Sequence, residues 1–372
     1  MDYNYTRITV MKVKMRVLGT CVRARKAVPL QRQMTLLFYA YMFNPLNDNR
    51  MKKFCSLVLF ALCAMRLFPT PQGALPNVFS VAANKQVYFS NGNLQIKPYE
   101  YLWRFAPYQY EIAGIDNALI AGSASVFIDL FGWATSGWVS STAKAHMPWD
   151  ASTNDADYIL GNDFHLGMTG DNANADWGVE NAISNGGSKV GLWRTLTADE
   201  WEFLLFDRDD AENKCAIGMV GDVHGLIILP DNFELPSGLK WNGAATSWDA
   251  NRYAQSKNEW DKMDAAGALF LPCAGARTGT EVNGINYYGG YWSTDYFDQN
   301  TASALVFDET SIDVNGLYRS QGYSVRLVQD AEPQAIDQVQ SNKVQGTKVI
   351  RNGMLYLMYN GTMYNVQGAE VK

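Results

Sequence analysis

The tryptophans of this chain are confined to one stretch. All 11 of them lie between Trp103 and Trp292, although the chain has 372 residues. Large aromatic side chains bury much apolar area and dominate the cores in which they lie. The clustering therefore predicts one aromatic-rich globular unit rather than two domains with separate cores. Hydrophobic residues make up 47% of the chain, which is enough to fill such a core.

Two segments carry the signals of a short helix. Thr197 and Glu200 are spaced as a capping box, in which each side chain accepts a hydrogen bond from the other residue's backbone N–H. Ser256 and Glu259 have the same spacing, and Gly267 is placed where the second helix would end. We therefore expect two short capped helices. The first would bury an apolar face made of Trp201, Leu204 and Leu205.

Three acids surround this tryptophan, namely Asp199, Glu200 and Glu202. Grouped carboxylates can serve catalysis, but these residues also have a structural reason to lie at a helix start. Acids in the first turn complement the positive end of the helix dipole, and a good cap contributes about 1 kcal/mol. We interpret the cluster as the chemistry of helix initiation.

The rest of the chain is rich in strands and loops. Residues 78–110 have the pattern of strands, with an Asn-Gly hairpin signal at Asn91-Gly92. Residues 136–187 are rich in Gly, Asn, Asp, Ser and Trp, lack periodicity, and are expected to be loops over the core. Few helices among many strands, without regular alternation, indicate an α+β fold.

The N-terminal region has the pattern of an export signal. Lys52 and Lys53 precede an apolar run at residues 54–65, and polar and small residues follow it. Because this run is too short to span a bilayer, we expect residues 51–73 to be a signal peptide, with a buried core helix as the alternative. The mature protein would have no membrane span and would be extracellular or on the outer cell surface, or otherwise periplasmic. Residues 1–50 are then expected to be a misassigned upstream extension.

Charge is divided unevenly along the chain. The first 73 residues hold 12 of the 31 basic residues and 2 of the 37 acidic ones, so the remainder carries a net charge of about −16. A surface this acidic repels phosphate backbones, which predicts that nucleic acid is not a partner. Basic or neutral proteins and uncharged ligands such as sugars stay open.

Several motifs, taken in order, resemble one family. RTLTADEWEFLL, at residues 194–205, is similar to the R-L-P-T-E-A-E-W-E segment of formylglycine-generating enzymes, a branch of the C-type lectin-like fold. LPDNFELPSGL, AGALFLPCAGART and GGYWSTDY follow, and GYSVRLV is similar to the G-F-R-L-V strand that closes such domains. The resemblance spans residues 78–329 and implies a C-type lectin-like domain over residues 74–330.

The chemistry of that family does not carry over. Formylglycine-generating enzymes use two closely spaced cysteines late in the domain, whereas no cysteine follows Cys273 in this chain. Related iron-dependent enzymes need a histidine cluster, and His146, His165 and His224 are widely separated. The calcium-binding tripeptides of sugar-binding C-type lectins do not occur either. The resemblance therefore implies a scaffold without catalytic residues, cofactor or metal; a hydrolase with a carboxylate pair is the alternative.

The sequence leaves two features undecided: a possible calcium loop and a possible disulfide. Residues 171–178, DNANADWG, place Asn172, Asn174 and Asp176 at alternating positions, as calcium loops do, but lack the later glycine and glutamate of an EF-hand. We interpret them as a polar turn, with calcium binding as the alternative. Cys215 and Cys273, the two cysteines of the expected mature domain, can form a disulfide or stay as free thiols.

The stretch before the closing strand is both aromatic and polar. Rigid aromatics beside glycine, asparagine and aspartate are typical of adaptable binding surfaces, although Trp292 itself is expected in the core. Relatives of this fold that diversify their binding face vary in this region. The resemblance therefore implies a non-catalytic protein that binds a glycan or protein ligand, with a fimbria-like structural subunit as another alternative. The exposed ligand-contact candidates are Tyr288, Asp295, Tyr296, Asp298, Asn300, Asn315, Tyr318 and Arg319.

The C-terminal region changes composition. Residues 331–347 are polar and are expected to be a linker. Asn-Gly pairs at positions 352–353 and 360–361 divide the alternating runs of residues 348–372 and predict a three-stranded meander. This end is similar to the C-terminal sorting domain of type IX secretion substrates in Gram-negative bacteria, which implies recognition by a secretion system. An extra β-element packed on the main domain is the alternative.

Overall fold

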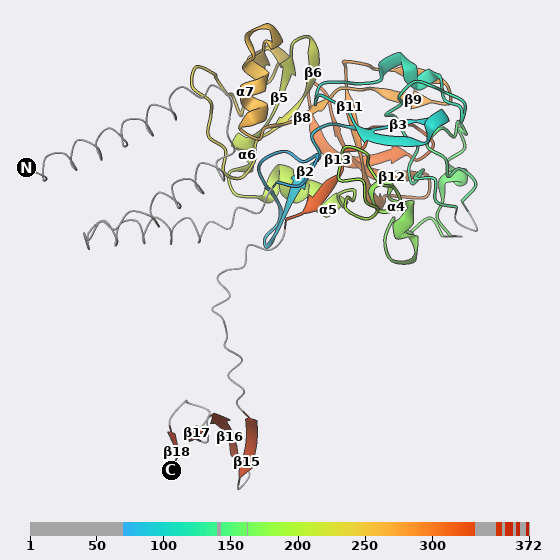
Figure 1. Ribbon diagram of the computed structural model, residues 1–372. Coiled ribbons are helices and arrows are strands. Elements are labelled where there is room, and N and C mark those ends of the chain that lie inside the picture. The colour runs from blue at the N-terminus through green and yellow to red at the C-terminus, as the bar shows by residue number, and fades with distance from the viewer. Residues whose placement is uncertain are drawn as a thin grey trace, which may run out of the picture. The chain divides into compact units, whose positions relative to one another are not determined.

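The computed structural model describes residues 70–139, 143–161 and 163–331, together with the backbone of four strands between residues 347 and 371. The expected upstream extension, the signal peptide up to residue 69 and residues 332–346 of the expected linker lie outside the described residues. Among the helices described, none is long and apolar enough to cross a membrane. The body is an α+β fold with few short helices and many short strands in small sheets (Figure 1).

Five small sheets form the body, as far as its described residues show. One sheet has the order β1-β2-β14, a second pairs β3 with β4, a third has the order β7-β5-β6-β8, a fourth pairs β9 with β10, and a fifth has the order β11-β12-β13. The strands of the first three sheets are β1 (Phe79–Ala82), β2 (Lys85–Phe89), β14 (Val328–Asp330), β3 (Leu94–Lys97), β4 (Leu102–Phe105), β5 (Cys215–Val220), β6 (Val223–Ile228), β7 (Arg252–Tyr253) and β8 (Leu269–Pro272). The others are β9 (Ala276–Thr278), β10 (Glu281–Asn283), β11 (Gly289–Tyr296), β12 (Thr301–Phe307) and β13 (Ile312–Tyr318).

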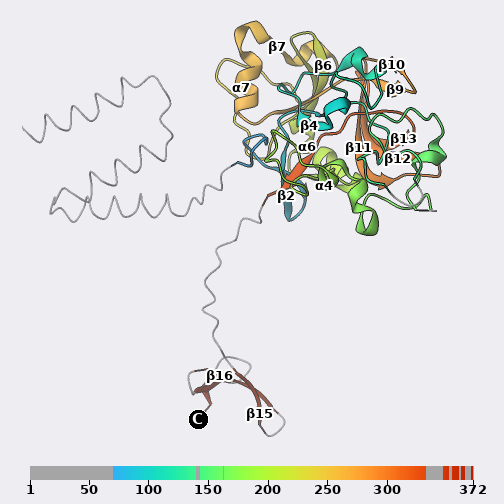
Figure 2. The same ribbon diagram turned by 45° about the vertical axis from the view of Figure 1, so that its right-hand side comes forward.

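The helices are short and lie at the periphery of these sheets. Figures 1 and 2 show α7 beside β6 on one side of the domain and β9 on the other side. Short 3-10 helices punctuate the loops. Residues 136–187, which were expected to be loops, have no strand within their described part, but they include the short helix α4 that this expectation missed. The α-helices are α4 (Trp177–Glu180), α5 (Ala198–Glu202), α6 (Ala211–Lys214) and α7 (Glu259–Ala265), and α5 continues into a π-helical turn at Phe203–Asp207.

The predicted capping box of α5 is confirmed. The Thr197 hydroxyl accepts a hydrogen bond from the Glu200 N–H at 3.1 Å, and the Glu200 carboxylate accepts one from the Thr197 N–H at 3.0 Å. The expected apolar face is buried, since Trp201, Leu204 and Leu205 are at most 3% exposed. The helix therefore begins where the local spacing indicates.

The second predicted capping box is wrong. Ser256 lies in a preceding 3-10 turn, and α7 begins after Asn258, which has a φ of 52° and no side-chain cap bond. The left-handed backbone of Asn258 turns the chain between Ser256 and the helix. The Glu259 carboxylate therefore accepts a hydrogen bond from the N–H of Ala254 instead of that of Ser256, at 2.9 Å.

The predicted end of α7 is confirmed. Gly267 has a φ of 89°, which favours glycine. Its N–H donates to the Asp264 carbonyl at 2.8 Å, and the N–H of Ala268 donates to the Met263 carbonyl at 3.0 Å. These two bonds are the Schellman pattern, which satisfies carbonyls of the last helical turn.

The predicted hairpin at Asn91-Gly92 is also wrong, because β2 and β3 belong to different sheets. The N–H of Ser90, before this pair, donates to the distant carbonyl of Leu327, and the N–H of Leu94, after it, donates to that of Val325. Gly92 is required for a different reason, because a Cβ there would collide with the carbonyl oxygen of Ala106. The dipeptide thus marks a close backbone crossing and not a hairpin turn.

The core is built on both faces of two sheets. In β11–β12, Tyr291, Leu305 and Phe307 join one apolar cluster, while Trp292 and Ala304 join a second one on the opposite face. Strands β5, β6 and β8 divide their side chains in the same way between the first cluster and a third one. Because the clusters share these sheets, the tryptophans belong to one compact unit, as the clustering predicts.

The C-terminal strands form an antiparallel sheet of their own. The pairings Arg351↔Met354 and Tyr359↔Thr362 leave two-residue connections at the two Asn-Gly pairs, as predicted. The expectation of three strands is wrong, because a fourth short strand follows a five-residue connection that has no Asn-Gly signal. The strands are β15 (Thr347–Arg351), β16 (Met354–Tyr359), β17 (Thr362–Tyr364) and β18 (Glu370–Val371).

The two cysteines of the body are free thiols. Cys273 is buried, and Cys215 is partly buried at the start of β5. Burial raises the pKa of Cys215 to about 12, so this thiol stays protonated at neutral pH. The sequence left a disulfide and two free thiols as alternatives, and the structure has the free thiols.

Candidate functional site

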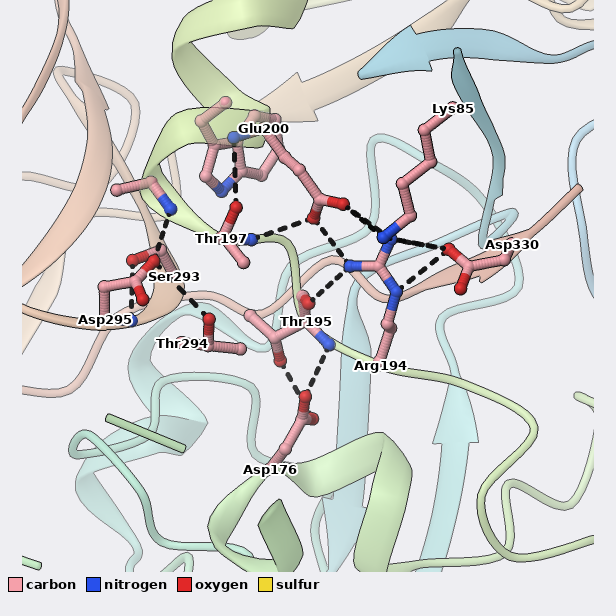
Figure 3. Close-up of polar contacts among 12 residues, drawn as sticks. Lys85, Asp176, Arg194, Thr195, Thr197, Glu200, Ser293, Thr294, Asp295 and Asp330 are labelled. Atoms are coloured by element: carbon pink, nitrogen blue, oxygen red, sulfur yellow. Dashed lines mark hydrogen bonds and ion pairs between the residues drawn. The ribbon is translucent and has the colours of Figure 1, made fainter. Parts of the chain in front are cut away.

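The acid cluster around Trp201 lies in the polar network that Figure 3 shows. The guanidinium of Arg194 donates to both carboxylate oxygens of Glu200, at 2.6 and 2.9 Å, and the ammonium of Lys85 lies 2.8 Å from the same carboxylate. Arg194 also donates to Asp330 at 2.6 Å. Glu200 is only 6% exposed, whereas the Lys85 and Asp330 side chains are 44% and 53% exposed, so the network joins β2, α5 and β14 with its central carboxylate buried.

Burial alone would raise the pKa of Glu200. The hydrogen bond and charge of Arg194, with the further hydrogen bond from Lys85, outweigh burial and hold that pKa below its usual range. Asp199 and Glu202 are exposed on the helix surface. The carboxylate that is buried is thus engaged by structural partners, which confirms the interpretation of the cluster as helix chemistry.

Asp176, the last candidate of the calcium-like loop, is buried and structural. It accepts hydrogen bonds from the N–H of Thr195 at 2.7 Å, from the Thr195 hydroxyl at 3.0 Å and from the N–H of Gly178 at 3.0 Å. The last of these bonds caps α4. Across the described part of the chain, no group of three His, Cys, Asp or Glu side chains is arranged to hold a metal ion.

Asp295 is half-buried and directed at the same helix. Its carboxylate accepts a hydrogen bond of 2.6 Å from the N–H of Ala198, the first residue of α5 (Figure 3). Burial raises the pKa of Asp295, and this hydrogen bond offsets part of that rise. The exposure expected for Asp295 is therefore only partial, because the carboxylate satisfies a backbone donor at the helix start.

The exposure expected for Arg319 is wrong, because this side chain is 0% exposed. Its guanidinium donates to the carbonyls of Phe164, Asp298 and Thr301, at 2.7, 3.0 and 3.2 Å. It also lies 4.8 Å from the ring centroid of Trp133. A planar guanidinium can reach several acceptors at once, so Arg319 clamps two loops to the end of the β11–β13 sheet.

The strand register separates the two tyrosines at this end. Tyr296 pairs with Ala302 and Tyr318 pairs with Thr301, which are neighbours along β12. Successive residues of a strand point to opposite faces, and paired residues share a face, so Tyr296 and Tyr318 project from opposite sides. Both are exposed, at 38% and 54%, but they do not form one surface.

Asp298 and Asn300 lie in the exposed connection between β11 and β12. The Asp298 carboxylate accepts hydrogen bonds from the N–H groups of Asn300 and Thr301, at 2.9 and 2.8 Å. A side chain that bonds to backbone groups two and three positions ahead forms an Asx-type turn. Asp298 thus shapes the connection that brings β12 back beside β11.

The remaining two candidates, Tyr288 and Asn315, meet at a pocket on the β11–β13 sheet. The pocket has a volume of about 320 Å³ and is open to solvent. Its lining consists of Tyr288, Gly289, Gly290, Val306, Phe307, Asp308, Ser311, Asn315, Gly316, Leu317 and Tyr323.

Three polar or aromatic lining residues escaped the sequence analysis: Asp308, Ser311 and Tyr323. Asp308 and Ser311 belong to the turn after β12, whose Asp-Glu-Thr-Ser sequence is an Asx-turn signal. Tyr323 lies in the segment assigned to the closing strand, and no local pattern indicates that its ring faces the pocket. Only the packing of distant segments brings these residues beside Tyr288.

Comparisons with family models, with curated proteins and with solved structures found no match for the chain. Functional inference therefore depends on the geometry of the described residues. Of the places that the sequence indicates, the pocket is the hollow in which two candidates, the half-buried Tyr288 and the exposed Asn315, lie together. The Glu200 network and the Asp176 cap are occupied by structural contacts.

Proposed function

We propose that the protein is an exported, non-catalytic binding protein that takes a glycan or protein ligand into the pocket on β11–β13. The observation that carries this proposal is the pocket itself, where Tyr288 and Asn315 lie together with Tyr323 and Asp308. A volume of about 320 Å³ is within the range of small-ligand sites, roughly 300–1,000 Å³. Aromatic rings beside a few polar groups offer contact area and orientation to a ligand.

We further propose that residues 74–330 adopt the C-type lectin-like fold that the motifs suggest. The α+β composition with short helices and small sheets supports this assignment. The segment similar to the closing strand leads into β14, which pairs with β2 near the start of the body. A last strand that pairs with β2, the second strand of the body, is compatible with a closing role.

The hydrolase alternative receives less support from the acids that the structure describes. Glu200 is engaged by Arg194 and Lys85, Asp176 by Thr195, and the buried Asp129 by Asn117. A catalytic carboxylate needs to reach its substrate, and these three serve the fold instead.

Assembly through the edge strand β13 is also less favoured. Two of its backbone donors, the N–H groups of Val314 and Gly316, are bonded at 2.8 Å to the side chains of Asp313 and Asn315. Edge strands protected by their own polar side chains pair less readily with another chain. These contacts favour a binding protein over a subunit that grows by strand addition.

The proposal is tested with the full chain on glycan and protein arrays, with and without calcium. Specific binding should be lost in Tyr288→Ala. It should persist in Tyr318→Ala, an exposed tyrosine outside the pocket lining, which is the matched control. Binding that survives Tyr288→Ala, or that is lost equally in both variants, would refute the pocket as the site.

Export is tested separately on the native protein. Mass spectrometry should find a mature N-terminus near residue 74, and a peptide from residues 1–40 would contradict the proposed start and signal. Removal of residues 348–372 should abolish surface display if this tail is read by a secretion system. Unchanged display would end that part of the proposal.

A further inference from the structure

Two glycines allow tyrosine rings to line the pocket closely. A Cβ at Gly290 would lie 2.5 Å from the ring of Tyr323, and a Cβ at Gly284 would meet the ring of Tyr288. The ring of Tyr323 also packs edge-on against Trp292, with centroids 5.2 Å apart. The rings are therefore held in place before any ligand enters. Tyr323 is only 4% exposed, so the half-buried Tyr288 is the tyrosine that offers a face to the apolar side of a flat or chair-shaped ring.

The carboxylate of Asp308 presents one free acceptor to the pocket. Its Oδ1 atom accepts hydrogen bonds from the N–H and hydroxyl of Thr310, both at 2.7 Å, and from the N–H of Ser311 at 3.0 Å. These bonds lower the pKa of Asp308, so the group is ionised at neutral pH. The Oδ2 atom is not used by the turn and has no hydrogen-bond partner among the residues that the structure describes.

The amide of Asn315 presents one free donor. Its Oδ1 atom accepts a hydrogen bond of 2.8 Å from the N–H of Gly316, which fixes the orientation of the amide. The Nδ2 group then faces away from that bond, and no described residue accepts a hydrogen bond from it. The pocket thus combines an anionic acceptor at Asp308 with a neutral donor at Asn315.

These groups select the ligand by charge and by hydrogen-bonding capacity. The lining contains no lysine, arginine or histidine, and its one charge is the carboxylate of Asp308, so phosphates and sugar acids are repelled. An ammonium group could bond to Asp308, but it has only donors and leaves the amide of Asn315 unused. Hydroxyl groups donate and accept, and therefore satisfy both residues.

We propose that the pocket takes the ring of a neutral saccharide without calcium. One hydroxyl donates to Asp308 Oδ2, another accepts from Asn315 Nδ2, and the C–H face of the ring packs on Tyr288. This inference rests on the proposed function, because it names the ligand class of the same pocket. The volume of about 320 Å³ limits the enclosed part to about one sugar unit.

The test uses the full chain and the methyl glycosides of glucose, galactose and mannose, with glucuronic acid and Nα-acetyl-lysine amide as charged probes. Saturation-transfer NMR and calorimetry in EDTA measure binding. Two nearly isosteric variants remove one function each: Asp308→Asn replaces the free acceptor by a donor, and Asn315→Asp replaces the free donor by an acceptor. Both keep the Oδ1 atom that the backbone uses. Asp313→Asn, on the same strand but outside the lining, is the control.

At least one neutral glycoside should bind, and each pocket variant should weaken its affinity about tenfold, the expected loss of one charge-assisted or neutral hydrogen bond. Asp313→Asn should bind as the unmodified chain does. If only the lysine probe binds, and Asn315→Asp raises the affinity for that probe, the saccharide inference is wrong while the pocket remains a binding site. If no probe binds and no array ligand depends on Tyr288, the inference and the proposed function both fail.

Discussion

Arg194 and Glu200 form a two-point ion pair, with hydrogen bonds of 2.6 and 2.9 Å between guanidinium and carboxylate. The same carboxylate accepts the N–H of Thr197 and contacts Lys85, while the same guanidinium reaches Asp330. The two residues are six positions apart in sequence, and their contacts connect the start of α5 to β2 and β14, which are neighbours in one sheet. Glu200 therefore both caps α5 locally and contacts Lys85, which is distant in sequence.

Replacing Glu200 by glutamine should destabilise the fold by about 3 kcal/mol. Glutamine preserves the shape of the capping side chain, but it leaves the largely buried charge of Arg194 without its principal partner. The matched control is Glu202→Gln in the same helix, which is exposed and should change stability by about 0.5 kcal/mol or less. Urea denaturation of the variants measures both effects, and equal losses would contradict the special role of Glu200.

Asp129 should make stability depend on pH between about 4 and 6. Burial raises the pKa of Asp129 from 3.8 to about 6, although hydrogen bonds from Asn117, Ala113 and Gln95 oppose that rise. The unfolded chain therefore loses this proton at lower pH than the folded chain does, so the group's contribution to stability falls as pH rises through this window.

The Asp129→Asn variant isolates this effect, because asparagine does not titrate. Its stability relative to the unmodified protein should increase between pH 4 and pH 7 by on the order of 2–3 kcal/mol, which corresponds to a pKa shift of about two units. Any hydrogen bond lost by the substitution adds a constant offset at both pH values. A stability difference that does not change with pH would contradict the raised pKa.

Gly92→Ala should be far more disruptive than Asn91→Ala. A methyl group at position 92 would collide with the Ala106 carbonyl, which should cost about 2–3 kcal/mol in the free energy of unfolding. Asn91 sits in the crossing without a left-handed backbone, so alanine there should be tolerated within about 1 kcal/mol. Comparable losses at both positions in thermal or urea unfolding would favour a hairpin turn instead.

Arg319→Leu should destabilise the protein, whereas Tyr318→Ala should leave its stability nearly unchanged. Leucine fills part of the volume but leaves the carbonyls of Phe164 and Asp298 without their donor, at a cost of about 3 kcal/mol or more. The neighbouring Tyr318 is 54% exposed and serves as the control. If urea unfolding shows Arg319→Leu to be neutral, the loop clamp is wrong.

Expectations based on short spacings were the most accurate. The Thr197–Glu200 box, the Gly267 helix end and the two-residue turns of the C-terminal sheet all depend on bonds between residues at most five positions apart. Such bonds form wherever the backbone has the required local conformation. The second box failed because a single left-handed residue, Asn258, intervened in the spacing.

Expectations about exposure and site membership were less accurate. Arg319 and Tyr318 are adjacent in sequence and both polar, yet one is buried and the other exposed. Nothing in their local pattern separates them, because the difference arises from the loop at Phe164 packing over the sheet end. Tyr288 and Asn315 do line the pocket, but Tyr323 and Asp308 could not be assigned to it without the tertiary arrangement.

The amino-acid sequence alone determined the α+β composition, the capped start of α5 and the turns of the C-terminal sheet, because periodicity and hydrogen bonds between near neighbours dictate these features. The tertiary structure decided which backbone segments Asn91-Gly92 meets, the contact of Glu200 with Lys85 and the lining of the pocket. In each of these cases the decisive contact joins segments separated by many residues, such as Ser90 and Leu327. Which distant segments meet depends on how the whole core packs, and no local pattern carries that information.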